Sequence, residues 1–518
     1  MLATCAKFEP SPGRERQRVG VDKARCQDRV APVALQILFI VLAAANALFL
    51  WRALAQPWLA LACIVVVAAS GGLVFSKRER WSEVEWRWAA ICAVLALAIS
   101  VLGGAGHLMF TAEDWVARDS VLSDVARWRW PVTYDWHGVR WALRAPLGFY
   151  MLPGLAGAWL GLSVAHAAVL VQNTLILTAV LLLYLRGAQG WRWRVITLAV
   201  FVLFSGWDIV GEIKVWSLAQ AAGHSIPFPL HIERWAGDME YSSFLTDIFW
   251  APNHGLPAFA FVGAYLCWRR REISATALTV FAGLCVFWSP LAVMGMAPFI
   301  LLAAVTDLRR GRVRLRDLGF VLAVGLALLP VLLYLRLGSA SVVHGFAFQL
   351  LRGFWPRYGL FLTVEVVPIV YLMWRGGGRT RGSRVEMAMI TGMLVLIPLY
   401  LIGWNNDFMM RASIPPLVLA ALIIADRLEA NLQRRDWTSA ALAIVVLAVG
   451  AVTPALQIVR SFYYPATPPM TTDVPQVWER YSRTPPDTYL VPADMLGQLS
   501  PLFRTDSGSL RRRRPGAA

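Results

Sequence analysis

Two adjacent carboxylates, Glu113 and Asp114, are the side chains of this sequence best placed for acid–base chemistry. They follow closely on an apolar stretch and precede Trp115. Neighbouring like charges raise the pKa of one carboxyl group, and a carboxylate with a pKa nearer neutrality can act as a general base. Acids at the end of an apolar segment can equally be hydrated or cap a helix, so the pair also has a purely structural interpretation.

Three further side chains are candidates for proton transfer or anion binding. Asp407 and Arg411 lie four residues apart and can form an ion pair on one helix. Arg411 is equally suited to bind a phosphate group with two parallel hydrogen bonds. His254 can exchange protons or bind phosphate. Alternatively, it belongs to a turn in which Pro252 and Gly255 shape the entry into a helix.

No metal site is predicted. His224 and His231 are near one another in the sequence, but the intervening segment 225–230 contains Pro227 and Pro229 and cannot form regular helix. The spacing therefore does not place two histidines on one helix face, as a zinc site of that kind requires.

The elements that must position these residues are transmembrane helices. The chain has 518 residues, of which 58% are hydrophobic and only 16% are charged. Apolar runs such as Leu162–Leu185 reach the roughly 20 residues needed to cross a bilayer, and they do not alternate as barrel strands do. We therefore expect an all-α, polytopic bundle of about thirteen spans with helical outer loops. The expected spans are 33–51, 56–75, 87–104, 162–185, 191–206, 256–268, 276–288, 290–304, 317–335, 358–374, 386–402, 413–425 and 438–456.

The net charge of +17 orients this bundle. Clusters of Lys and Arg after every second span predict cytoplasmic loops by the positive-inside rule, so no nucleic-acid partner is expected. The N-terminal segment 1–31 is then cytoplasmic, and the tail 457–518 is on the outer side. The outer loops are 105–144, 207–254, 336–357 and 403–412. The apolar segment 145–160 must not cross, and we expect a broken, partly embedded helix there.

Charged and aromatic residues are concentrated in the predicted outer loops. Six of the seven histidines fall there, and only His166 lies in a span. Five tryptophans lie in the loop 105–144 alone. Tryptophan is typical of the membrane interface, and a stacking platform for a sugar is the functional alternative. Long outer loops in a compact bundle are usually functional or folded.

These features together resemble the GT-C superfamily of membrane glycosyltransferases. The likeness rests on many spans, an acidic pair soon after a span, and aromatic-rich segments at 121–125, 130–132 and 143–150, and it covers roughly residues 87–456. The segments around His254 and 406–411 also look like those of bacterial membrane proteins of this type. In the family the acidic loop follows the first span. Here it follows the third, which would make residues 32–86 an added N-terminal hairpin.

The resemblance implies an enzyme of the bacterial inner membrane that uses a polyprenyl-phosphate-linked sugar at the periplasmic face. It makes Asp114 the catalytic base, or in some members a metal ligand, with Glu113 as its partner. Arg411 would hold the lipid phosphate, with His254, Lys214 and Asp407 beside it. A divalent cation is the one cofactor it allows, membrane lipid is a further partner, and it carries no signal for an oligomeric state.

Two other functions compete with this interpretation. A transporter or flippase of a lipid-linked glycan would carry ionisable residues inside its spans. The expected spans hold few, chiefly His166 and Glu365. A non-catalytic envelope-assembly protein would tolerate replacement of the outer carboxylates.

Overall fold

The computed structural model describes residues 31–74, 85–188, 190–224, 231–375, 382–481 and 488–505. The predicted cytoplasmic segment 1–31 therefore lies outside the described residues, except for Ala31. The chain is mostly helical, with 73% helix and 5% strand, as expected from its apolar runs. Helices are favoured because hydrocarbon offers no partner for backbone N–H and C=O groups.

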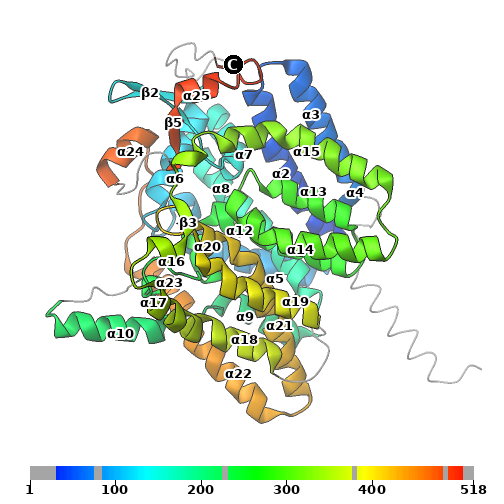
Figure 1. The fold of residues 1–518 in the computed structure, drawn as a ribbon, viewed down its shortest axis with the longest axis vertical. Coiled ribbons are helices and arrows are strands. Elements are labelled where there is room, and N and C mark those ends of the chain that lie inside the picture. Colours follow the sequence, from blue (N-terminus) through cyan, green and yellow to red (C-terminus); the bar gives the residue numbers. More distant parts are fainter. Residues whose placement is uncertain are drawn as a thin grey trace, which may run out of the picture.

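The main apolar helices run along almost the whole chain (Figure 1). They are α2 (Ala31–Ala53), α3 (Pro57–Ala69), α5 (Trp86–Leu102), α8 (Leu162–Leu185), α9 (Trp191–Leu203), α12 (Pro252–Arg269), α13 (Ala275–Cys285), α14 (Pro290–Arg309), α15 (Leu315–Arg336), α17 (Phe354–Phe361), α18 (Val367–Trp374), α19 (Arg384–Leu396), α21 (Ile414–Gln433), α22 (Trp437–Gly450) and α23 (Val452–Tyr463). The short α4 (Gly71–Val74) and α16 (Ala347–Leu350) complete this set.

Eight helical segments in the described part of the chain are long and apolar enough to cross a membrane. They are Val33–Ala53, Leu162–Leu185, Trp191–Ala221, Pro290–Arg309, Leu315–Arg336, Phe354–Trp374, Asp407–Gln433 and Trp437–Tyr463. Three shorter apolar helices, Pro57–Leu73, Trp86–Leu102 and Ala275–Cys285, match three other predicted spans. The criterion thus supports a membrane protein with eight spanning candidates, fewer than the thirteen expected.

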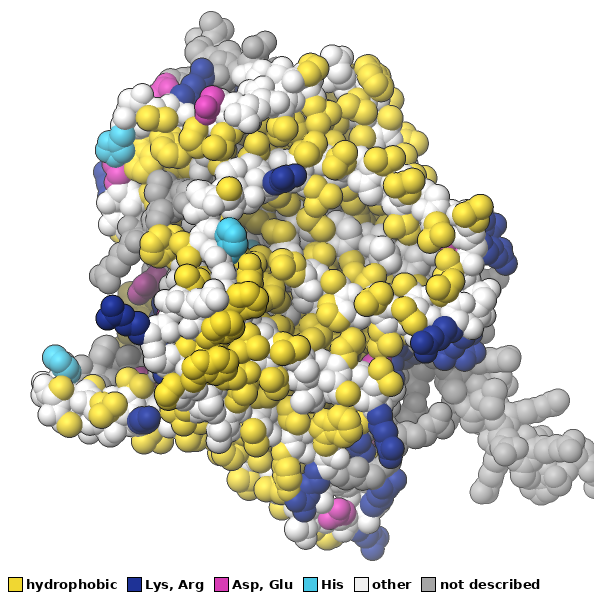
Figure 2. Space-filling model, viewed as in Figure 1, with side chains coloured by type: hydrophobic (Ala, Val, Ile, Leu, Met, Phe, Trp, Pro, Cys, Tyr) yellow, Lys and Arg dark blue, Asp and Glu magenta, His cyan; other side chains and the backbone are white. Residues whose placement is uncertain are grey.

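Burial separates central from peripheral helices. The apolar stretch within Asp407–Gln433 is 94% buried, whereas the one within Trp437–Tyr463 is 28% buried. Leucines on α15 such as Leu322 and Leu326 are exposed. Figure 2 shows hydrophobic side chains over much of one face. So large an apolar surface is typical of helices that face lipid.

The segments predicted to lie outside come together in space. Strands β1 (Thr133–Trp136) and β2 (Val139–Leu143) form a hairpin, and β5 (Leu490–Pro492) of the tail adds the third strand in the order β1-β2-β5. Strand β3 (His344–Phe346) pairs with β4 (Tyr400–Ile402), which joins loop 336–357 to the start of loop 403–412. Gly338 of the former loop abuts Val491 of β5. The outer loops thus contain short strands as well as the helices expected there.

The basic loops predicted to lie inside also meet one another. Arg186 is 2.6 Å from Glu272, and Arg269 is 3.1 Å from Glu386. In Figure 2, Lys and Arg side chains crowd the lower right edge of the molecule, and in Figure 1 the β1-β2-β5 sheet lies at the upper left. Loops that the charge pattern assigns to one side thus cluster together.

The apolar segment 145–160 folds as one helix, α7 (Gly148–Leu160), and is not broken. Pro153 lies inside it and removes the hydrogen bond to the carbonyl of Phe149. The side chain of Gln172 on α8 donates to that carbonyl instead, at 3.0 Å. Its 13 residues make α7 about 20 Å long, shorter than the roughly 30 Å hydrocarbon core.

Candidate functional site

Asp114 lies at the start of helix α6 (Trp115–Arg127). Its side chain does not cap the helix, which leaves hydration as the structural interpretation. It pairs instead with Arg118, one turn on, at 3.4 Å. The Asp114 side chain is 48% exposed, whereas that of Arg118 is 5% exposed. A buried guanidinium thus holds a solvent-accessible carboxylate, which is free to meet a proton donor from outside.

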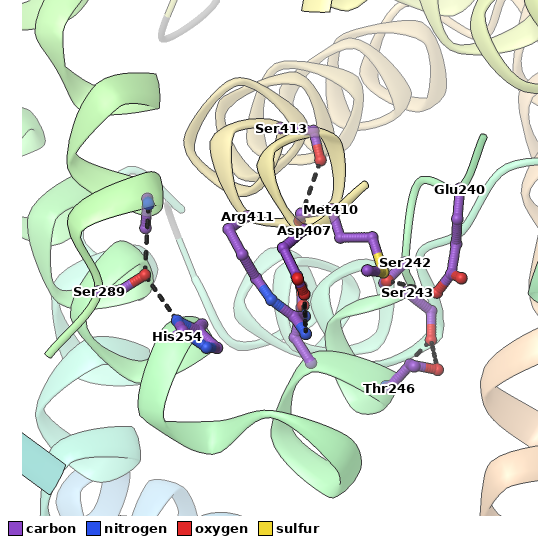
Figure 3. A network of polar contacts seen from close by, with 12 residues as sticks. Glu240, Ser242, Ser243, Thr246, His254, Ser289, Asp407, Met410, Arg411 and Ser413 are labelled. Atoms are coloured by element: carbon purple, nitrogen blue, oxygen red, sulfur yellow. Dashed lines mark hydrogen bonds and ion pairs between the residues drawn. The ribbon is translucent and has the colours of Figure 1, made fainter. Parts of the chain in front are cut away.

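Arg118 connects α6 to the start of α12. Its Nε donates to Asn253 Oδ1 at 3.4 Å, and Asn253 Nδ2 lies 3.1 Å from His254 Nε2. His254 Nδ1 lies 2.8 Å from the hydroxyl of Ser289, which also caps α14 (Figure 3). Pro252 occupies the first turn of α12, as the turn interpretation of this segment expects. His254 is thus held by hydrogen bonds on both ring nitrogens.

Arg411 lies on the short helix α20 (Asp407–Ala412), beside these residues (Figure 3). It is buried, 4.0 Å from Asp407 and 3.7 Å from Asp247 of α11 (Phe244–Trp250). Asn406 starts the helix with a left-handed backbone and accepts from the N–H of Met409. The predicted pairing of Asp407 with Arg411 is confirmed, but both ionic contacts are longer than tight, hydrogen-bonded ones.

The groups around Asp114 and Arg411 lie within electrostatic reach of one tail residue, Tyr489. Burial raises the pKa of Tyr489, a tail residue; the charges of Arg118 and Arg411 lower it, and those of Asp114 and Asp407 raise it. All four charged side chains therefore act on one phenol. The structure thereby brings together Asp114, Asp407, Arg411 and, through Arg118, His254.

Within the described residues, no hydrogen bond or ion pair joins the two remaining predicted residues, Glu113 and Lys214, to this group. Glu113 is exposed and interacts electrostatically with Arg460. Lys214 is exposed on α10 (Asp208–Ala221), which projects from the bundle in Figure 1. Among the described residues, no hydrogen bond or ion pair joins Lys214 to Asp114 or Arg411.

A buried acidic cluster next to the site was missed in the sequence. Glu233 and Glu240 flank His231, whose Nδ1 is 3.4 Å from Glu233 and whose Nε2 is 4.0 Å from Glu240. Burial raises the pKa of Glu233 well above its usual range, and the charges of Asp208 and Glu240 add to this. Burial also raises the pKa of Asp247, despite the charge of Arg411. These acids have no shared periodicity, and only their burial, which sequence does not show, distinguishes them.

His231 has a defined tautomer. The indole N–H of Trp250 donates to Gln457 Oε1 at 3.1 Å, which orients the amide. The Gln457 NH₂ group then donates to His231 Nδ1, also at 3.1 Å. Burial, with Arg460 and Arg234 adding to it, lowers the pKa of His231 to about 3. The ring is therefore neutral near pH 7, with its proton on Nε2.

A small pocket opens beside this cluster, with a cavity volume of about 10 Å³. Two of the predicted outer loops line it, loop 105–144 through Phe110 and Ala112 and loop 207–254 through Phe249 and Trp250. Gln457 and Arg460 of α23 form another part of the lining. Neither Asp114 nor Arg411 lines this pocket. Arg460 also lies over the ring of Trp250, at 5.2 Å, so the pocket joins a cation to an aromatic face.

Two groups of side chains within the described residues are close enough to hold a metal ion: His107, Asp119 and His166, and His231, Glu233 and Glu240. Neither includes Asp114. Protein-family models, curated proteins and solved structures were all compared with this chain, and none matches it.

Proposed function

We propose that this chain is a GT-C-like membrane glycosyltransferase, which moves a sugar from a polyprenyl-phosphate donor to an acceptor at the outer face of the membrane. The observation that carries the proposal is the convergence of Asp114, His254, Asp407 and Arg411, from three distant parts of the chain. A carboxylate for the acceptor and a guanidinium for the phosphate are the two groups that such a transfer needs.

In this proposal Asp114 accepts the proton of the acceptor hydroxyl as that oxygen attacks the sugar. Its exposure gives the acceptor access, and Arg118 fixes its orientation. The sugar–phosphate bond breaks, and the phosphate leaves with the negative charge. Arg411 stabilises that charge. Its ionic contacts of 3.7 and 4.0 Å are loose, and within the described part of the chain its Nε has no hydrogen-bond partner. An anionic oxygen could therefore take these donors at shorter distance.

The test is a transfer assay with the purified protein and a polyprenyl-phosphate donor that carries a radiolabelled sugar. We expect label to leave the lipid, and Arg411→Ala to raise the apparent KM for the donor. Arg316→Ala, at an exposed arginine remote from the site, is the matched control and should behave as wild type. Donor that remains intact with every acceptor class tried, whether lipid, glycan or peptide, would contradict the proposal.

One observation favours a lipid-linked glycan transporter as the second candidate. Glu365 is fully buried within the candidate span Phe354–Trp374, in a π-helical turn, and π-helical turns are frequent at functional sites. Its Oε1 accepts from the Trp235 indole at 2.9 Å. A transporter would move labelled donor between the leaflets of a vesicle without breaking the sugar–phosphate bond.

A further inference from the structure

The side chains of His107, Asp119 and His166 converge at a point that the proposed transfer reaction does not use. They come from the turn η2 (Ala105–His107), from α6 and from the start of α8. One ligand atom from each lies within 4.8 Å of those of the other two. His107 Nε2 is 3.1 Å, and His166 Nδ1 is 3.9 Å, from Asp119 Oδ1. All three side chains are almost completely buried.

Hydrogen bonds to the outer atoms of His107 and Asp119 leave lone pairs that point into the group. His107 Nδ1 lies 2.9 Å from the carbonyl oxygen of Thr467, which can only accept, so Nδ1 carries the proton. The Nε2 lone pair of a neutral His107 then points at Asp119 Oδ1. The second oxygen, Asp119 Oδ2, accepts the N–H of Met470 at 3.0 Å. Outer partners that fix the tautomer of a histidine and the rotamer of a carboxylate in this way are typical of metal ligands.

Hydrogen bonds alone do not satisfy every acceptor of this group. A proton on His107 Nε2 would satisfy the contact with Asp119, but it would leave His166 Nδ1 alone. That nitrogen is buried and has no hydrogen-bond partner among the described residues. A divalent ion between the three atoms would satisfy all of them at once. Ligands of tetrahedral zinc stand about 3.3–3.4 Å apart, given metal–ligand bonds of roughly 2.0–2.1 Å, and the two observed separations bracket that value.

The backbone is also built for this geometry. His107 has a left-handed backbone, with φ of 58°, which is uncommon for a residue other than glycine. Gly106 also has a positive φ, of 81°, and packs against α8 at Leu170 and the carbonyl of His166. A Cβ atom at position 106 would lie only 3.3 Å from the Leu170 side chain. The turn is thus pressed against the helix that carries the third ligand, and strain of this kind tends to mark functional sites.

The second group offers a useful contrast. The Nδ1 lone pair of His231 is already used by Gln457, and its Nε2 carries a proton. That histidine has no lone pair to give an ion without rearrangement. The group of His107, Asp119 and His166 does have lone pairs to give. Within the described residues, each of its histidines presents a ring nitrogen to which no donor is hydrogen-bonded.

We propose that His107, Asp119 and His166 bind one divalent transition-metal ion of the zinc type. Two imidazoles and a carboxylate are a ligand set that such ions prefer over calcium or magnesium, which favour oxygen. The ion joins α6 and α8. Because Thr467 and Met470 hold its ligands, it also fastens the tail segment to the outer loop. This site is separate from Asp114 and does not depend on the proposed transferase activity.

The test is metal content and binding in the full-length chain, purified in detergent with a tag that contains no histidine. After metal-free exchange and loading with Zn²⁺, we expect about one ion per chain to survive gel filtration. Co²⁺ in its place should show the visible absorption of a low-coordinate site. His166→Ala and the nearly isosteric Asp119→Asn should weaken binding by at least about 10–100-fold, the cost of losing even an outer partner.

The matched control is His224→Ala, at an exposed histidine remote from the group, which should bind as wild type does. The proposal fails if the wild-type chain retains no ion from either Zn²⁺ or Co²⁺, a result that needs no variant. It also fails if Asp119→Asn and His224→Ala hold the ion equally well. A monodisperse gel-filtration profile for each variant separates lost binding from lost folding. Should neither ligand variant fold, the wild-type measurement alone decides.

Discussion

Several ionisable side chains next to the candidate site are buried. Glu233 is fully buried and yet within reach of His231 and of other carboxyl groups. Its pKa in the folded chain is raised above the usual 4.5, chiefly by burial. The folded state therefore holds a proton that the unfolded state has released, and this costs stability as the pH rises above 4.5 toward the raised pKa. Below 4.5 both states are protonated and the cost vanishes.

We predict that Glu233→Gln makes the stability of the folded chain depend less on pH. The amide keeps the shape and can still accept the Ser243 N–H, but it does not titrate. Each unit of pKa shift is worth about 1.4 kcal/mol, so the variant should melt at least a few degrees higher than wild type at pH 8 and nearly the same at pH 4. Thermal unfolding in detergent measures it, with Asp135→Asn at an exposed carboxylate as the control. Parallel curves for Glu233→Gln and wild type would refute the assignment.

The sequence was informative about residues where spacing alone decides a contact. The four-residue spacing of Asp407 and Arg411 predicted their pairing, and Pro252 marked the start of a helix. Spacing could not predict that Arg118 binds Asn253, or that Tyr489 of the tail joins the site, because these residues are far apart in the sequence. The ligand group of His107, Asp119 and His166 was missed because its members come from three separate elements with no shared spacing.

At the scale of elements, the helices followed from apolar runs, but the three-stranded sheet did not. Its first two strands are only four and five residues long, too short for a clear alternating pattern. The turn between them carries the one usable signal, His137-Gly138, where both residues have positive φ as tight hairpins require. The third strand comes from the tail, which no local pattern could connect to this hairpin.

The pairing of β2 with β5 predicts a disulfide. Ala142 and Val491 are opposite one another, at the 4.5–5.5 Å typical of antiparallel partners, which is within disulfide reach. Cysteines at both positions, in a background without the six native cysteines, should therefore cross-link on oxidation. Peptide mass spectrometry after digestion without reductant would detect the bond.

The control for that experiment uses β1. Thr133 is opposite Ala142, so Thr133 and Val491 are two strands apart, or roughly 9–10 Å. Cysteines at 133 and 491 should not cross-link. Equal cross-linking of both pairs, or none for 142 with 491, would show that the tail does not occupy this sheet edge.

At the scale of the whole molecule, loops of like predicted side gather together. The charge pattern predicted which loops lie on the same side of the membrane, because the positive-inside rule acts on every loop independently. It could not fix the number of spans, since several helices, such as α13 with 11 residues, are shorter than a bilayer requires. Packing against neighbours decides whether such helices cross.

Sidedness itself is testable by thiol labelling in intact cells. We predict that a cysteine at His137, in loop 105–144, reacts with an impermeant reagent added outside. A cysteine at Arg310, between α14 and α15, should react only after the membrane is opened; both native side chains are exposed. The reverse pattern would invert the bundle and put Asp114 in the cytoplasm.

The central claim is that Asp114 removes the acceptor proton in a sugar transfer from a lipid phosphate. The most direct measurement is kcat of purified, folded Asp114→Asn in that transfer. General-base catalysis contributes about 10²–10⁴-fold, and we predict a loss in that range with donor binding nearly unchanged. Glu113→Gln should reduce kcat less, because the Glu113 side chain interacts with Arg460. Wild-type turnover by well-folded Asp114→Asn would contradict the claim.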